Sequence, residues 1–74
     1  MKYQCGDRVK FKYCIAKTNK LEEIEYNWYH GDGIIIGVFN NEPGIQYYIK
    51  LDLVMKSKDG LEYKNVFAME HNII

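Results

Sequence analysis

Two histidines, two cysteines and a glycine-rich tripeptide carry the side chains and backbone that catalysis or ligand binding would need. His30 precedes Asp32 by two residues, and Cys14 is distant in the sequence, so no local signature of a cysteine–histidine pair is present. The cysteines and histidines also lack the spacing of a zinc site. The tripeptide 31–33 is too short for a phosphate-binding loop, and no helical pattern follows it. The sequence predicts no catalytic residue, no metal site, no cofactor and no enzyme.

Aromatic residues are the best candidates for a binding surface. Tyr26, Trp28 and Tyr29 lie close together in the sequence, and Tyr48 is expected to point outward from another strand. Together they would form a concave surface that stacks bases, holds a proline-rich peptide or cages a methylated amine. The alternative is that Trp28 and some tyrosines fill the core, since an aromatic side chain buries about 150–250 Å².

Charge is unevenly distributed along the chain, although ten basic and ten acidic residues balance overall. Residues 1–20 contain six cations and one carboxylate, whereas residues 21–33 contain four carboxylates and no cation. The pattern favours neighbouring strands whose opposite charges face each other across a ladder. The alternative is a surface with one basic and one acidic patch. Three acidic residues join the aromatic candidates for partner binding: Glu22, Glu23 and Glu25.

A second candidate surface is basic. Arg8, Lys10 and Lys12 alternate with apolar residues, and Lys50 is expected on the outward face of another strand. If the two strands lie close, these side chains would share a face and could contact phosphates. A single arginine and zero net charge argue against this reading, because nucleic-acid-binding domains are usually clearly basic.

The elements that position these residues are predicted to be strands. Alternation of apolar and basic residues over 7–15 predicts a half-buried strand. Two apolar runs around a cluster of turn residues predict a β-hairpin over 31–56 at the centre of the sheet. Gly37 within it predicts a bulge or a close approach of the backbone. An edge strand is expected over 62–67, followed by one 3₁₀ turn within 68–71 and a last, short apolar strand.

The stretch 21–29 fits two patterns. Leu21, Ile24 and Trp28 follow helical spacing, whereas the apolar residues from Ile24 to Trp28 alternate. The aromatic residues favour a strand that pairs back on the first one as a long hairpin. Residues 30–33, with two glycines, are then expected to interrupt the chain between strands.

With 74 residues the chain has room for one domain, 1–74, with one small core. Short strands at regular spacing predict a small barrel or sandwich, and closure would remove the edges of so small a sheet. No signal peptide and no apolar run of bilayer length is visible, so a soluble, cytoplasmic protein is expected. Cys5 and Cys14 are expected to be free thiols.

The order of these motifs resembles the SH3-like barrels, in particular the small barrels of the Tudor and KOW type. The family's Gly-Asp-x-Val opening corresponds to residues 6–9, its Gly-x-Gly-x-Ile strand to 31–35, and its Tyr-Tyr-Val-x-Phe-Asp strand to 47–52. Residues 66–74 correspond to the closing strand, the 3₁₀ turn and the last strand. The resemblance implies an all-β, single SH3-like barrel of five to six antiparallel strands with a short 3₁₀ turn near the C-terminus. It identifies a fold and not an activity.

Members of this superfold are typically binding modules for peptides, nucleic acids or ribosomal and polymerase partners, and many bind their ligands at the long first loop. The expected function is therefore recognition of a protein through the aromatic and acidic surface. A composition rich in Lys, Asn, Ile and Tyr is typical of a low-GC bacterium or phage. It suggests a phage or prophage accessory protein, or an inhibitor that docks on a host protein. The alternatives are a nucleic-acid-associated barrel using the basic face and a homo-oligomer formed through a strand edge.

Overall fold

A computed structural model describes residues 2–41, 44–57 and 60–74 of the chain. These residues form one antiparallel sheet of four strands, in the spatial order of the sequence, and a single 3₁₀ turn. The elements are β1 (Arg8–Thr18), β2 (Ile24–Asn41), β3 (Gly44–Lys56), β4 (Glu62–Met69) and the 3₁₀ turn η1 (Glu70–Asn72). The all-β prediction is confirmed, as is the central place of the β2–β3 hairpin and the edge position of β4.

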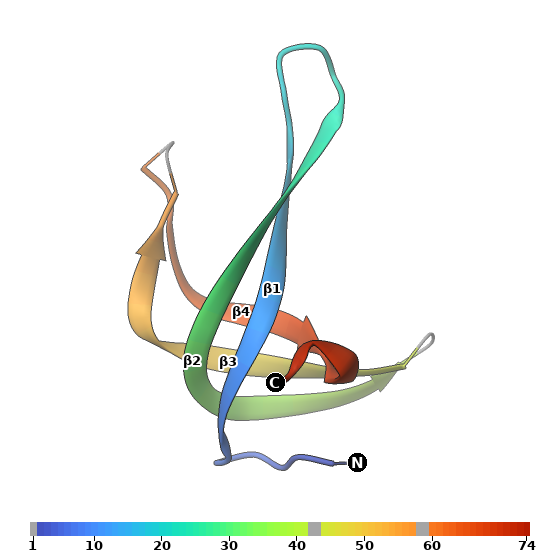
Figure 1. The fold of residues 1–74 in the computed structure, drawn as a ribbon, viewed down its shortest axis with the longest axis vertical. Coiled ribbons are helices and arrows are strands. Elements are labelled where there is room, and N and C mark those ends of the chain that lie inside the picture. Colours follow the sequence, from blue (N-terminus) through green and yellow to red (C-terminus); the bar gives the residue numbers. More distant parts are fainter. Residues whose placement is uncertain (1, 42–43, 58–59) are drawn as a thin grey trace.

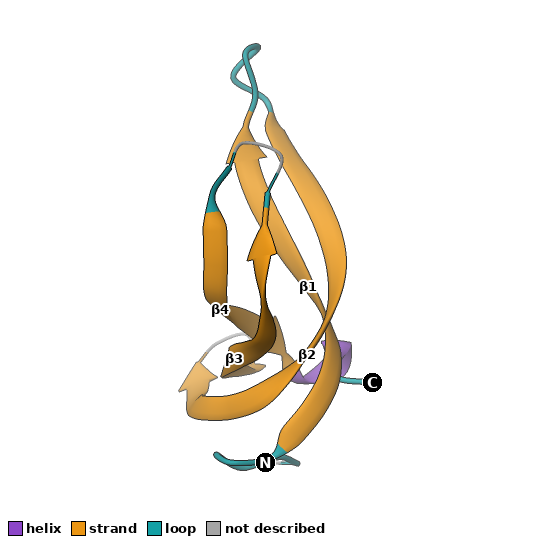
Figure 2. Cartoon of the chain, turned by 90° about the vertical axis from the view of Figure 1, so that its left-hand side faces the viewer, coloured by secondary structure: helices purple, strands orange, loops and turns teal. Residues whose placement is uncertain are grey.

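The sheet is strongly bent. In Figure 1, β2 and β3 each turn sharply, so that their lower parts lie beneath two upright hairpins. The β1–β2 hairpin extends farther from this base than the β3–β4 hairpin, as Figures 1 and 2 show from two directions. The upper part of the β1–β2 hairpin, residues 14–28, is called the long arm below.

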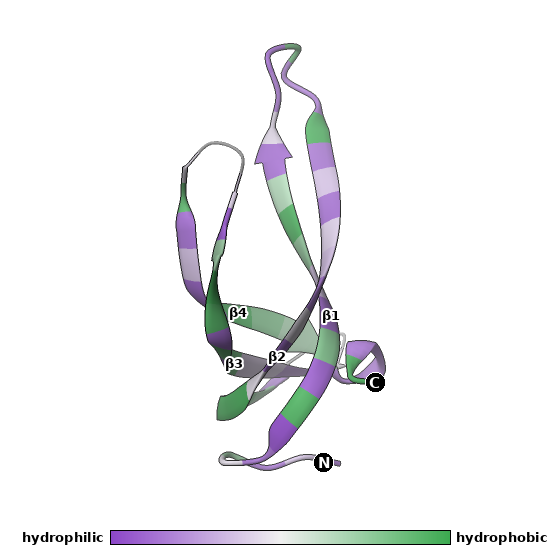
Figure 3. Ribbon diagram, turned by 60° about the vertical axis from the view of Figure 1, so that its left-hand side comes forward, coloured by the Kyte–Doolittle hydropathy of each residue, from purple (hydrophilic) through white to green (hydrophobic). Residues whose placement is uncertain are grey.

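The core lies on the concave side of the bend. Apolar and polar residues alternate along β1, visible as alternating bands in Figure 3, and this turns every second side chain inward. All four strands contribute to the buried cluster, which consists of Val9, Phe11, Tyr13, Ile35, Tyr47, Ile49, Leu51, Val66 and Ala68. The half-buried strand predicted over 7–15 is thus confirmed, and it continues to Thr18.

Two glycines allow β2 to approach its neighbours closely without breaking. Gly31 pairs with Phe11, and a Cβ atom at Gly31 would lie 3.0 Å from the Tyr13 ring and 3.2 Å from the Phe11 ring of β1. A Cβ atom at Gly33 would overlap the carbonyl oxygen of Lys50 and would lie 2.8 Å from Ile49 Cγ2. The predicted interruption at 30–33 is therefore wrong, because the glycines serve packing inside a continuous strand.

A register shift between Ile35 and Gly37 confirms the bulge predicted at that glycine.

The turn before β2 is held by Asn19, whose side-chain oxygen accepts hydrogen bonds from the backbone N–H groups of Leu21 (2.9 Å) and Glu23 (3.0 Å). From Ile24 onward the segment is a strand, as the alternation predicted, and the helical alternative is wrong. Both other predicted turns include residues outside the described part of the chain.

The described residues contain four strands, so the prediction of five to six is wrong. The segments predicted on either side of residues 30–33 are one strand, β2. The last apolar residues do not form a separate strand: Ile73 makes an isolated antiparallel bridge with Phe11, and the Ile74 N–H donates to the Lys10 carbonyl at 2.8 Å. The end of the chain therefore contacts the edge of β1, while the sheet itself is open.

Nowhere in the described ranges is there a helix long and apolar enough to cross a membrane.

One buried tyrosine fastens η1 to the core. Tyr47 is fully buried, and its hydroxyl donates a hydrogen bond to Glu70 Oε2 at 2.7 Å while accepting one from the Tyr3 N–H at 3.4 Å. Burial, and secondarily the bond to Glu70, raises the pKa of Tyr47, so the hydroxyl remains a donor. The same bond is the main cause that lowers the pKa of Glu70.

The bond between Tyr47 and Glu70 predicts a loss of stability in acid. Because the folded pKa of Glu70 lies below its unfolded value, this stabilisation is complete above the unfolded pKa and disappears as the pH falls through the folded pKa. We expect Tyr47→Phe to lower the melting temperature at neutral pH, and the difference from wild type to shrink on acidification. Thermal melts between neutral and strongly acidic pH measure this difference. A difference that stays constant over that range would contradict the assignment.

Candidate functional site

The outer face of the long arm carries three large, exposed side chains in a row. Ile24, Tyr26 and Trp28 alternate along β2 and therefore point to the same side. Their exposed fractions are 59%, 64% and 59%, so none of them belongs to the core. We call these three residues the exposed row. The structure thus places Trp28 at the surface.

Small residues lie directly across from the exposed row. The register of β1 and β2 pairs Cys14 with Trp28, Ala16 with Tyr26 and Thr18 with Ile24. Directly paired residues of an antiparallel ladder share a face. The large side chains of β2 therefore stand beside a strip of short ones, and no neighbouring ring on β1 covers them.

Tyr29 lies on the opposite, inner face of the long arm. It pairs with Tyr13, and the two rings stack with centroids 5.6 Å apart and planes 28° from parallel. Tyr29 is partly buried against the core and lines a cleft of about 160 Å³ between the two hairpins. Burial, with the nearby Tyr29 as a smaller cause, raises the pKa of Tyr13. Of the predicted aromatic candidates, Tyr29 therefore lies on the opposite face from Tyr26 and Trp28, although Tyr29 and Trp28 both line a hollow of about 310 Å³.

The acidic candidates are divided between the tip and the inner face. Glu22 and Glu23 are exposed in the turn at the end of the long arm, where Glu22 has a positive φ of 61°. Glu25 pairs with Lys17 in the ladder and accepts a hydrogen bond from the Asn19 side chain at 3.2 Å. This cross-strand pair agrees with the facing of opposite charges that the sequence favoured.

Tyr48 belongs to a second aromatic cluster, on the outer face of β3 and β4. Its ring centroid is 4.7 Å from that of Phe67, which lies 6.0 Å from that of Phe39. Phe67 and Phe39 are both exposed. The sequence did not single out Phe67, although alternation with the inward-facing Val66 and Ala68 could have placed it outside.

A hollow between β1 and β4 connects the two aromatic sites. It has a volume of about 240 Å³, and Trp28 and Phe67 both line it. The polar groups at its rim include Lys12 and Asn72, which also line an adjoining hollow of about 310 Å³ beside Trp28. Trp28 lines this hollow directly, whereas Tyr48 is connected to it by its contact with Phe67.

The four basic candidates share the outer face of the sheet. Arg8 pairs with Ile34, which pairs with Lys50 on its other side, so β2 separates the two cations. Carboxylates interrupt this surface. Arg8 forms an ion pair with Asp52 at 2.5 Å, and the next cation along β1, Lys10, pairs with Asp32 in the ladder. Lys12, the fourth cation, lies opposite His30.

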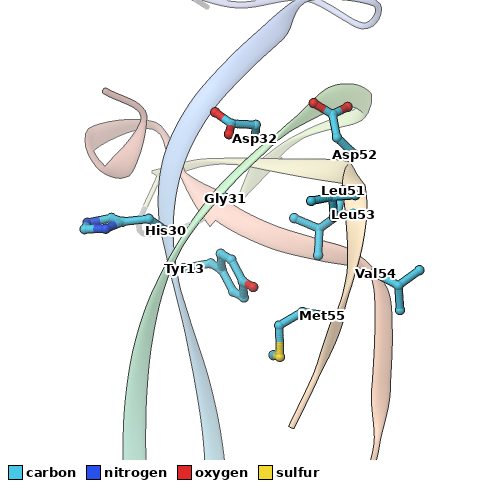
Figure 4. A pocket seen from close by; sticks show the side chains of 9 residues that line it. All are labelled: Tyr13, His30, Gly31, Asp32, Leu51, Asp52, Leu53, Val54 and Met55. Atoms are coloured by element: carbon cyan, nitrogen blue, oxygen red, sulfur yellow. The ribbon is translucent and has the colours of Figure 1, made fainter.

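The residues with catalytic chemistry do not form a site. A hollow of about 280 Å³ lies between β2 and β3, and it is lined by Tyr13, by residues 30–32 and by Leu51 to Met55 (Figure 4). Although His30 and Asp32 both line it, the imidazole points away from the other side chains, and the Asp32 carboxylate does not point toward the imidazole. Cys14 lies across from Trp28 in the ladder and is a free thiol, like Cys5. Within the described ranges, His, Cys, Asp and Glu form no group of three that could hold a metal.

Comparison with protein-family models, with curated proteins and with solved structures found no match for this chain. Its geometry is therefore the basis on which a function has to be argued.

Proposed function

We propose that this chain is a non-enzymatic binding module that recognises a protein partner through the exposed row and the adjoining hollow. The observation that carries the proposal is the exposure of Ile24, Tyr26 and Trp28 side by side on an arm that extends beyond the core. Contiguous exposed apolar surface is costly in water and marks interaction sites. Trp and Tyr are also enriched among the residues that contribute most to protein binding.

The proposed architecture is an SH3-like barrel in which the end of the chain closes against the edge of β1 without forming a strand of its own. Its support is the Phe11–Ile73 bridge and the hydrogen bond from Ile74 to Lys10, which attach the C-terminus to the edge of β1. The 3₁₀ turn between β4 and this last segment agrees with the family pattern. In this architecture the long arm corresponds to the long first loop.

Charge favours a protein over a nucleic acid as the partner. Glu22 and Glu23 occupy the tip beyond the exposed row, where they would repel a phosphate backbone and attract a basic protein surface. An acidic, aromatic arm suits a phage-type accessory protein or inhibitor that docks in a basic groove of a larger, cytoplasmic host protein. The composition supports that origin.

A second candidate function is association with nucleic acid through the basic residues of the outer face. Its support is the placement of Arg8, Lys10, Lys12 and Lys50 on that one face. It predicts binding to DNA or RNA that weakens steeply as salt increases. Retention on neither nucleic acid at low salt would remove this candidate.

The protein-binding proposal predicts that Trp28→Ala weakens binding to the captured partner by about 30-fold or more, since a hot-spot side chain contributes about 2 kcal/mol. The fold should survive, because Trp28 is exposed. Capture from the cells in which the chain occurs, followed by titration of the purified partner, measures the effect.

The matched control is Leu53→Ala, which also removes a large exposed side chain (84% exposed) but lies outside the exposed row. We expect this variant to bind the partner as wild type does. Equal losses in the two variants would show that exposure alone, and not the long arm, determines binding. An unfolded Trp28→Ala variant, detected by circular dichroism, would show that Trp28 is structural.

A further inference from the structure

The upper part of β1 is an unpaired sheet edge. The Asp7 carbonyl points toward β2 and accepts a hydrogen bond from the Ile35 N–H of that strand. The Lys10 carbonyl points the other way and accepts a hydrogen bond from the Ile74 N–H. Backbone groups alternate along a strand, and the β1–β2 register runs without a shift to Thr18. The N–H and C=O groups of Cys14, Ala16 and Thr18 therefore face away from β2. Among the described residues, no strand pairs with this side of β1 beyond Phe11.

This edge has little of the protection that edge strands usually carry. Natural edges are commonly blocked by proline, by a bulge or by charged side chains. Lys12 is the one charged residue whose backbone faces outward beyond Phe11; the other three, Cys14, Ala16 and Thr18, are short and uncharged, and β1 has no bulge. An added strand would lie beside these three residues in the plane of the sheet.

The base and the tip of the β1–β2 hairpin carry charges of opposite sign. Its base carries Lys10 and Lys12 on β1, with Asp32 of β2 paired to Lys10, and its tip carries Glu22 and Glu23 against one cation, Lys20. Two such hairpins placed side by side in opposite directions bring the acidic tip of each toward the basic base of the other. The parallel arrangement would instead place tip against tip.

We propose that two copies of this chain pair antiparallel through the upper edge of β1, with the two-fold axis at Ala16. Ala16 then faces Ala16 of the second copy, and Cys14 faces Thr18 of the second copy on either side. In this register Lys17 faces Ile15 of the second copy, so no like charges oppose each other between Cys14 and Thr18. Thr18 ends the added strand opposite Cys14, before the position that Ile73 and Ile74 occupy on the same edge, and the turn residue Lys20 of the second copy follows toward Lys12.

The occupant is a second copy because the edge is complementary to itself in both size and charge. The small residues on each strand accept the close approach of the other, and the tip-to-base attraction requires both copies. The pairing uses the backbone edge of β1, so the exposed row stays open on the outer face of each copy. The hollow between β1 and β4, which Lys12 and Cys14 line, lies at the same edge, so an added strand and a partner seated in the hollow would compete for it. The pairing itself does not rest on the proposed protein partner.

Charge substitutions at the two-fold axis test this pairing. Ala16→Lys places two ammonium groups opposite each other, and Ala16→Glu does the same with two carboxylates. We expect wild type to show a mass that rises with concentration toward twice that of the chain in sedimentation equilibrium under reducing conditions. Each variant alone should associate about tenfold more weakly or worse, because like charges would face each other in the interface. An equimolar mixture of the two should recover association, as opposite charges then meet.

Asn65→Glu is the matched control, since it adds a charge, opposite Lys50, on an exposed residue of β4 away from this edge. It should associate as wild type does. Three results would overturn the proposal: a wild-type chain that stays monomeric up to millimolar concentration, association that persists in both Ala16 variants, or a mixture that remains monomeric although circular dichroism shows both variants folded.

Discussion

Gly33→Ala is expected to destabilise the fold by about 3 kcal/mol, at the upper end of the cost of overpacking a core. The added methyl group would overlap the Lys50 carbonyl oxygen and approach Ile49 Cγ2 to 2.8 Å. The Lys50 carbonyl belongs to the backbone of the paired strand β3, so it cannot rotate away as a side chain could. Relief would require β2 and β3 to separate at the centre of the sheet.

Gly44→Ala is the matched control for that substitution. A Cβ atom at Gly44 would meet one flexible group, the Met69 methyl, at an ordinary distance of 3.7 Å. We expect its unfolding free energy to stay within about 1 kcal/mol of wild type, since no atom has to move. Urea denaturation measures both variants, and equal effects at the two glycines would contradict the close packing of β2 on β3.

Phe11→Ala should cost about 3–5 kcal/mol, the range for removing a fully buried aromatic ring. Phe11 is 0% exposed, its ring lies 5.6 Å from that of Tyr13, and its backbone bridges to Ile73. A chain of this length is stabilised by about 4–11 kcal/mol in total. The variant is therefore expected to lose a large part of its stability.

Phe67→Ala removes the same ring from an exposed position and is the control. Phe67 is 53% exposed and contacts Tyr48 on the outer face. We expect it to cost about 1 kcal/mol, roughly the value of an aromatic pair. Chemical denaturation followed by circular dichroism compares the two. A Phe67→Ala variant as unstable as Phe11→Ala would show that the outer aromatic cluster is part of the core.

The alternation of side chains predicted most of the fold. It identified the inward face of β1 and the central β2–β3 hairpin. Successive side chains of a strand point to opposite faces, so an apolar residue at every second position determines which face of the strand is buried. Gly31 and Gly33 misled the interpretation, since glycine at a strand break and glycine beneath a core ring look alike in a sequence. Only the contacts of Gly31 with the Phe11 and Tyr13 rings, and of Gly33 with the Lys50 backbone, distinguish them.

The candidate surface could be predicted in part. The sequence pointed to Tyr26 and Trp28 but left open whether Trp28 is buried, because that depends on its cross-strand neighbour Cys14. Tyr29 follows Trp28 directly, so the strand period alone could have placed it on the other face. The involvement of Phe67 depends on how β4 approaches β1 across the bend, which no local pattern encodes.

We propose that the outer face of the long arm is the surface that binds a protein. The most direct test is to follow the backbone and indole N–H resonances of the isotope-labelled chain by NMR while the captured partner is added. We expect the largest changes at Tyr26, at Trp28 including its indole N–H, and at Ala16 across the ladder. Changes that leave these three residues unaffected and map elsewhere, for example to Arg8 and Lys50, would contradict the claim.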